Sequence, residues 1–363
     1  YGLTLFALLF FFPAAASTRP LDSVALQAEA MSLHEDPYWK LLLHYRKEGR
    51  GYISEADGPA FFLATDGKTN PQAELQANLS AFLGETENDP EKQARCRFPL
   101  RYRWLKERLG FPAPPAEQEP CPLFTAWMKE IQAESVSLIF SSYYMSAPAS
   151  MFGHTFLKFN ARKNEDHPLL DWAINFAANP GEMGLLRYAL YGLAGGYPGN
   201  FSVTPYHLKV NEYNNRDNRD LWIYELDFSA AEIETMLLHA RELQSTYFDY
   251  FYLDENCSYH LLSLLEIARP SLDLTGAFQR WVLPGETVAH IVNKTRIVKR
   301  IQYRPSHVSQ IQGRLETLAE QERSLFFGLL SQKRSMQDLE ELDADRQLFL
   351  GDLLLSPLRL RMQ

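Results

Sequence analysis

A lone cysteine stands just inside the start of a predicted helix, in the segment Asp254-Glu255-Asn256-Cys257-Ser258-Tyr259-His260-Leu261-Leu262. A thiol at that position lies over unpaired backbone N–H groups and the positive end of the helix dipole, both of which favour the thiolate. The thiolate is the reactive form, so Cys257 is a candidate nucleophile. A nucleophilic thiol also needs a base, and the base needs a group that orients it.

His154 is the candidate base because it begins a predicted strand directly after Met151-Phe152-Gly153, at the mouth of a sheet. A further strand is predicted over residues 169–177. A hairpin turn centred between Asn164 and Glu165 would place Asn175 opposite His154 on the same sheet face. The Asn175 carbonyl would then fix the imidazole tautomer, as in Cys-His-Asn sites, and Asp171 is the alternative orienting residue.

Each of these residues also has a plain structural interpretation, as a buried thiol, a satisfied polar residue or an edge asparagine. A metal site is the competing chemistry, because His260 follows Cys257 by three residues and His239 lies upstream. The sequence contains no His-Glu-x-x-His motif and no Cys-x-x-Cys pair to complete a ligand set. It also lacks the Gly-x-Ser-x-Gly elbow of serine hydrolases. We therefore predict a thiol site without metal or other cofactor.

Composition places the chain among ordinary globular proteins of about two domains. It has 363 residues and a formal net charge of −9, which argues against a general nucleic-acid binder. Of the three cysteines, Cys96 and Cys121 flank a proline-rich connector, residues 111–122, and we expect them to form a disulfide. Closing such a loop stabilises a fold by roughly 3 kcal/mol in the chain-entropy model. Cys257 is then the unpaired thiol.

Residues 1–17 read as a signal peptide, with an apolar run followed by Pro13-Ala14-Ala15-Ala16-Ser17 as a cleavage site. An uncleaved membrane anchor is the alternative, although the run is short for a span. Either interpretation places the mature protein outside the cytoplasm. The other end, near Gln363, lacks a clear domain ending, so the full-length protein could continue beyond it.

The remaining chain divides into three predicted parts. Residues 22–130 form a mostly helical N-terminal module, in which a helix opening at Asp36-Pro37 carries Leu41, Leu42 and Tyr45. Residues 131–300 hold the predicted sheet and the Cys257 helix, with a glycine-rich loop over 192–199 and a capping box at Ser229-Ala230-Ala231-Glu232. Residues 301–363 form a helical C-terminal extension.

Several stretches around these residues resemble a known family, the Lnb-type N-terminal periplasmic domain. They include Ser150-Met151-Phe152-Gly153-His154-Thr155-Phe156-Leu157, Ala173-Ile174-Asn175-Phe176-Ala177, Gly195-Gly196-Tyr197-Pro198-Gly199, Arg219-Asp220-Leu221-Trp222-Ile223-Tyr224 and Asn256-Cys257-Ser258. The order of a strand-borne histidine followed by an Asn-Cys helix is that of circularly permuted papain-like, NlpC-like enzymes. The segment from Cys96 to Cys121 is similar to the helical module that precedes this domain in relatives.

The resemblance implies an α+β fold, namely a circularly permuted papain-like domain with an antiparallel sheet and a Cys-bearing helix, preceded by a mostly helical domain. It also implies a periplasmic cysteine-dependent acyltransferase, like the family member that transfers an acyl chain to the N-terminus of lipoproteins. Cys257 would carry the acyl group and His154 would act as base, while Tyr143, Tyr144, Asn256 and Tyr197 are predicted to supply oxyanion or substrate contacts.

Three classes of function stay open. An acyltransferase would act on a lipid or lipoprotein at the membrane surface, along an apolar channel lined by Phe152, Tyr191, Tyr197 and Phe201. A peptidase or amidase would cut peptidoglycan peptide or lipid amide. A non-catalytic envelope module would keep the fold alone. Larger relatives carry a membrane-embedded C-terminal part, which the full-length protein could share.

Overall fold

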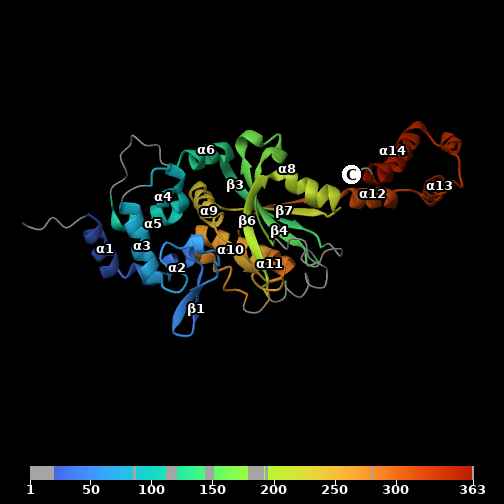
Figure 1. Ribbon diagram of the computed structural model, residues 1–363. Helices are drawn as coiled ribbons and strands as arrows, with labels where there is room; N and C mark the ends of the chain where they lie inside the picture. Colours follow the sequence, from blue (N-terminus) through green and yellow to red (C-terminus); the bar gives the residue numbers. More distant parts are fainter. Residues whose placement is uncertain are drawn as a thin grey trace, which may run out of the picture.

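A computed structural model describes residues 20–84, 87–111, 121–143, 151–178, 192, 195–278 and 281–361. Figure 1 shows a central sheet with the N-terminal helices on one side and the last helices projecting from the other. The predicted signal peptide, residues 1–17, lies outside the described residues. The described part is a mixed fold of helices and an antiparallel sheet, as expected for an α+β protein.

The central sheet has seven described strands in the order β8-β6-β5-β4-β3-β7-β9, and all neighbours are antiparallel. Their bounds are β3 Ala133–Ser141, β4 His154–Ala161, β5 Trp172–Ala178, β6 Tyr197–Pro205, β7 Leu221–Leu226, β8 Phe248–Tyr250 and β9 Val298–Arg304. The second half of the glycine-rich segment, predicted as a loop, is therefore the start of β6. The sheet also ends in β9, so the predicted domain boundary at residue 300 falls inside a strand.

Strand β4 is covered on both faces, which explains why nearly all of its residues are buried. On one face, Thr155 bonds Ser258 of helix α10 (Cys257–Ala268), with helix α9 (Ala230–Leu243) beside it. On the other face, Phe156 packs against Tyr206 of α8 (Tyr206–Lys209) and Tyr213 of the π-helical segment Val210–Arg216. Side chains of β4 alternate between these two layers.

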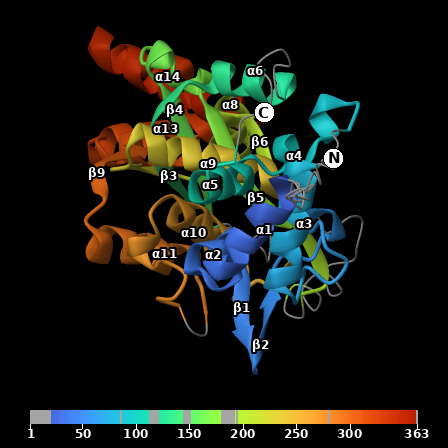
Figure 2. The same cartoon turned by 90° about the vertical axis from the view of Figure 1, so that its left-hand side faces the viewer.

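The N-terminal module contains helices and a hairpin. The helices are α1 Pro20–Ala30, α2 Pro37–Leu42, α3 Pro71–Leu83, α4 Ala94–Arg97, α5 Pro99–Leu109 and α6 Pro122–Ile131. The hairpin pairs β1 (Tyr45–Glu48) with β2 (Gly51–Ser54) and projects from the body, as Figure 2 shows. The prediction that Tyr45 belongs to the α2 helix was wrong. The backbone reverses at His44, which adopts φ +52°, and Tyr45 begins a strand.

The predicted disulfide is confirmed. Cys96 and Cys121 are bonded, and their Cα atoms lie 5.2 Å apart. The bridge joins α4 to the start of α6 across the proline-rich connector, of which residues 112–120 lie outside the described residues. Cys257 is the free cysteine, and it is buried.

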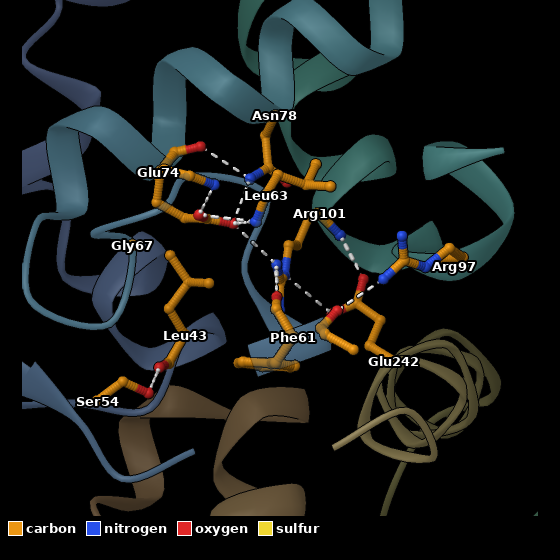
Figure 3. A network of polar contacts seen from close by, with 12 residues as sticks. Leu43, Ser54, Phe61, Leu63, Gly67, Glu74, Asn78, Arg97, Arg101 and Glu242 are labelled. Atoms are coloured by element: carbon orange, nitrogen blue, oxygen red, sulfur yellow. Dashed lines mark hydrogen bonds and ion pairs between the residues drawn. The ribbon is translucent and has the colours of Figure 1, made fainter. Parts of the chain in front are cut away.

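A buried ionic network joins the N-terminal module to α9 (Figure 3). The guanidinium of Arg101 donates to the carbonyl of Phe61 at 2.8 Å and lies 3.4 Å from Glu74 and 3.5 Å from Glu242. All three charged side chains are fully buried. Glu242 also accepts the backbone N–H groups of Leu100 and Arg101, at the start of α5. The module and the sheet accordingly share one cluster of buried apolar side chains.

The chain after β9 forms three helices, α12 His307–Glu316, α13 Glu320–Leu330 and α14 Ala344–Arg361. They enclose a separate small apolar cluster around Phe326, Leu350 and Leu353. Figure 1 shows these helices, coloured red, beyond the edge of the sheet that β9 forms. A helical C-terminal extension was predicted here, and helices do follow β9. A further helix, α11 Pro284–His290, lies against α10.

Replacing Arg101 with methionine should destabilise the protein by about 3–5 kcal/mol, because two buried carboxylates would lose their cation. Chemical denaturation of both proteins measures the difference in free energy of unfolding. Arg103→Met is the matched control, since Arg103 pairs with Glu234 at the surface, 3.4 Å away. That exchange should cost less than about 1 kcal/mol. Equal small losses for both variants would contradict the structural importance of the network.

Candidate functional site

Cys257 is the first residue of α10, and its position is fixed by the residue before it. The Asn256 side chain caps the helix by accepting the N–H groups of Ser258 (3.0 Å) and Tyr259 (3.3 Å). Its amide also donates to the carbonyls of Tyr252 and Val282. The cap does not bind the N–H of Cys257 itself. Asn256, predicted as a substrate or oxyanion contact, thus serves here as a helix cap.

His154 and Asn175 meet on the same sheet face, as predicted. His154 Nε2 lies 2.6 Å from Asn175 Oδ1, and both side chains are buried. An amide oxygen only accepts hydrogen bonds, so Nε2 carries the proton and Nδ1 is left free to take one. Asn175 therefore fixes the tautomer that a base for Cys257 requires.

The strand register that led to this pair was nevertheless wrong by two residues. Leu157 pairs with Ile174 and Phe159 with Trp172, so Asn175 stands opposite Phe156 and reaches His154 diagonally. The connection is longer than a tight turn because it contains two short helical turns, Arg162–Asn164 and Pro168–Leu170. A shift of two residues keeps every side chain on its predicted face.

The alternative orienting residue, Asp171, has other partners. Its carboxylate lies 2.8 Å from Lys158 Nζ and accepts the N–H of Ala161 and the amide of Asn164. Asn175, and not Asp171, is therefore the partner of His154.

His154 and Cys257 interact directly. Burial alone raises the pKa of the Cys257 thiol, but the charge of His154, a hydrogen bond with its side chain, the N–H of Thr155 and the Tyr250 hydroxyl together lower it to about 6. Cys257 is 1% exposed and His154 is 6% exposed. The thiolate is consequently the favoured form at neutral pH in a site largely closed to water.

Gly153 makes this contact possible. It adopts φ +93°, and a Cβ there would stand 2.6 Å from the Phe140 ring and 3.1 Å from the Ser141 carbonyl. A residue with a side chain would have to displace the end of β3, which pairs Ser141 with His154. The glycine before His154 thus sets where β4 begins.

Two residues that the sequence did not single out enclose the site. The Tyr213 ring lies 5.2 Å from the His154 ring, and the Arg219 guanidinium lies 5.1 Å from the Tyr213 ring. Arg219 is 2% exposed and donates to the carbonyls of Ser142 (2.6 Å) and Ser141 (3.2 Å). Arg219 is the first residue of one of the stretches that resemble the Lnb-type domain, and that resemblance was the sequence signal that could have identified it. Tyr213 had none.

The remaining predicted contacts are scattered. Tyr143 is 70% exposed, and Tyr144 lies outside the described residues. Tyr197 is buried in β6 beside Tyr250. Of the predicted channel residues, Phe201 packs in the core against Phe176, Phe152 is partly exposed at the surface, and Tyr191 lies outside the described residues.

The histidines considered as metal ligands are engaged elsewhere. His239 lies 3.0 Å from His44 and 3.1 Å from Glu242, in the interface between α9 and the N-terminal module. His260 is buried between Phe176 and Phe248, with ring centroids 4.3 Å away in both cases. Within the described residues no group of three or more His, Cys, Asp or Glu side chains is arranged to hold a metal ion.

Comparison with known proteins identifies two regions. Residues 31–108 match a domain of unknown function (DUF7843), and residues 123–294 match the Lnb N-terminal periplasmic domain. Neither a curated protein nor a solved structure matches significantly. In the part of the chain that the structure describes, every helix is too short or too polar to cross a membrane.

The second match covers the strands β3 to β8, helix α10, His154, Asn175 and Cys257. Because that family is defined as periplasmic, the match supports export from the cytoplasm. Residues 123–294 therefore form a domain of the Lnb N-terminal periplasmic family, and a DUF7843 module at residues 31–108 precedes it.

Proposed function

We propose that this protein is a periplasmic thiol acyltransferase that works through a thioester on Cys257. The observation that carries the proposal is the chain of contacts from Asn175 through His154 to a buried thiol with a lowered pKa. A structural cysteine needs neither an oriented imidazole nor a helix N-terminus. Perturbed groups in this arrangement are typical of nucleophilic sites.

The reaction would proceed in two transfers. His154 Nδ1 takes the proton of the Cys257 thiol, and the thiolate attacks the carbonyl carbon of an acyl ester. The negative charge on the carbonyl oxygen is met by the backbone N–H of Cys257. The C–O bond then breaks, the leaving alcohol takes the proton from His154, and a thioester remains. An amine attacks this thioester, gives its proton to His154, and the C–S bond breaks to release an amide and the thiol.

We further propose that the domain is a circularly permuted papain-like fold. In this chain the strands that carry His154 and Asn175 precede the helix that carries Cys257. The antiparallel sheet with the cysteine helix packed on it agrees with that fold, and the order along the chain agrees with the permutation. The functional analogy is separate from the fold and depends on the site alone.

Hydrolysis is the alternative function, because water in place of the amine would make the same site a peptidase or amidase of the cell wall. The protected position of Cys257, 1% exposed, favours transfer, since exclusion of water keeps a thioester from being hydrolysed. A non-catalytic envelope module is the third alternative. It would not require the His154–Asn175 hydrogen bond.

The proposal predicts a covalent acyl-enzyme on Cys257. Incubation with a diacylated lipopeptide whose N-terminal amine is blocked should add one acyl mass to the protein, removable by hydroxylamine. Cys257→Ser should show no such adduct, because its hydroxyl lacks the acidity of the thiol. Intact-mass spectrometry measures both. Peptide cleavage without an adduct would favour the hydrolase. If neither an adduct nor cleavage is observed, the proposal of thiol catalysis is wrong.

The pH dependence of alkylation tests the lowered thiol pKa. The Cys257 pKa of about 6 means that the iodoacetamide reaction rate rises with pH to a plateau, with its midpoint near pH 6. In His154→Gln the burial that raises the pKa persists while the imidazole is lost, so the midpoint should move upward by about two pH units or more. The midpoint is the readout, because the absolute rate also depends on access to the buried thiol. An unchanged midpoint would show that His154 does not act on Cys257.

Asn175→Ala tests the orienting residue. Without the amide oxygen the imidazole can adopt the other tautomer, and acyl transfer should fall about 10- to 100-fold in kcat. Two variants are the controls. Asn175→Gln keeps an amide at this position, and Ser202→Ala changes the residue opposite Asn175 on β6 without altering Asn175 Oδ1. Ser202→Ala should stay close to wild type. Full activity in Asn175→Ala would remove Asn175 from the mechanism.

A further inference from the structure

A second site lies on the same sheet face as His154 and Asn175, farther along the strands. It is a groove over β4, β3, β7 and β9 with a volume of about 780 Å³. Ligand sites commonly span about 300–1,000 Å³. Residues that alternate along β4 and β3, among them Lys158, Asn160, Ser135 and Ser137, form its floor. Phe156, Tyr206 and Tyr213 separate the groove from His154.

One buried group in the groove lacks a partner. Tyr206 is 3% exposed, and its hydroxyl makes no hydrogen bond within the described part of the chain. Arg304 and Asp171, which also line the groove, act on this hydroxyl electrostatically. Burial raises the pKa of Tyr206 to about 12, so the group stays a neutral donor and acceptor. A buried hydroxyl without a partner is costly and calls for an explanation, such as a ligand that supplies one.

The groove carries balanced charge. Its lining contains as many basic as acidic residues, namely Lys158, Arg162, Arg300 and Arg304 against Glu134, Glu165, Asp171 and Glu225. Lys158 lies 2.8 Å from Asp171, and Arg300 lies 3.4 Å from Glu225. A phosphate or other polyanion would instead select an excess of basic groups. The groove therefore suits an uncharged ligand.

The neutral part of the lining consists of hydroxyl and amide groups. Asn160 donates to Ser135 at 2.9 Å and to Ser137 at 3.1 Å, and Gln302 adds a further amide from the exposed edge strand β9. Leu169, 39% exposed, and Ile223 add apolar surface to the lining. Closely spaced donors and acceptors beside apolar side chains match a chain of sugar rings, whose hydroxyls both donate and accept and whose faces are apolar.

We propose that this groove binds a neutral glycan chain and holds the protein on the carbohydrate of the cell envelope. The Tyr206 hydroxyl completes its hydrogen bonding with a sugar hydroxyl or acetamido group. Cys257 takes no part in this binding, so the proposal can be tested independently of the acyl transfer proposed above.

Tyr206→Phe is the decisive variant, because it deletes the hydroxyl and keeps the ring. Calorimetric titration with a β-linked N-acetylglucosamine oligomer should show binding to the whole chain, weakened about tenfold in the variant by loss of one hydrogen bond. The variant should be as stable as wild type or more so, since the deleted group has no partner in the free protein. Tyr102→Phe is the matched control, because the Tyr102 hydroxyl is also buried without a partner but lies in α5. It should leave binding unchanged.

A second pair of variants tests the edge strand. Gln302 lines the groove, whereas Ile301 pairs with Tyr224 and points to the other face, so Gln302→Ala should weaken binding and Ile301→Ala should not. Sedimentation with purified peptidoglycan repeats the comparison on the polymer. Absence of binding to both probes would overturn the proposal, as would unchanged affinity in Tyr206→Phe and Gln302→Ala. Tighter binding of a polyphosphate or a peptide would replace the glycan with that ligand. Alkylation of Cys257 should be unaffected by all four variants, which separates this test from the thiol chemistry.

Discussion

The site depends on one constraint, the packing of the first turn of α10 against the beginning of β4. Asn256 ties the helix start to the carbonyls of Tyr252 and Val282, and Thr155 bonds Ser258 at 2.9 Å. These contacts bring two residues, distant in sequence, to one point at which a thiol and an imidazole meet. Because the anchoring groups are side-chain amides and hydroxyls with fixed geometry, the helix cannot slide or rotate without breaking several buried hydrogen bonds at once.

The rest of the fold supports this junction from behind. Helix α9 packs beside α10, and its Glu242 side chain is held by Arg101 and the start of α5 from the N-terminal module. The module therefore does more than precede the Lnb-type domain, since its buried charges and apolar side chains continue the same core. A domain boundary placed by sequence near residue 130 separates two sequence regions, but it does not separate two hydrophobic cores.

Sequence reasoning located what depends on local chemistry. The Ser229–Glu232 capping box, the N-terminal start of α10 at Cys257 and the Cys96–Cys121 pairing follow from neighbouring residue types, and the structure confirms them. The register of β4 and β5 was missed because the connection contains helical turns that no hairpin rule predicts. Tyr213 was missed because a π-helical segment, whose partners are set by tertiary packing, brings it to His154, and Arg219 was missed because it reaches the site only through Tyr213. The Tyr45 strand was missed because helical spacing ran past a backbone reversal at His44.

One sheet face thus holds two chemically different compartments. At one end, His154 and Asn175 stand beneath Tyr213 in a site where a charged thiolate is shielded from water. At the other, Lys158 and Asp171 lie in an open, charge-balanced groove. The aromatic layer of Phe156, Tyr206 and Tyr213 divides them, with ring centroids about 6 Å apart, such as 5.7 Å between Phe156 and Tyr213. Because packed aromatic rings fill the space between the two compartments, water in the open groove is kept away from the buried Cys257 thiol.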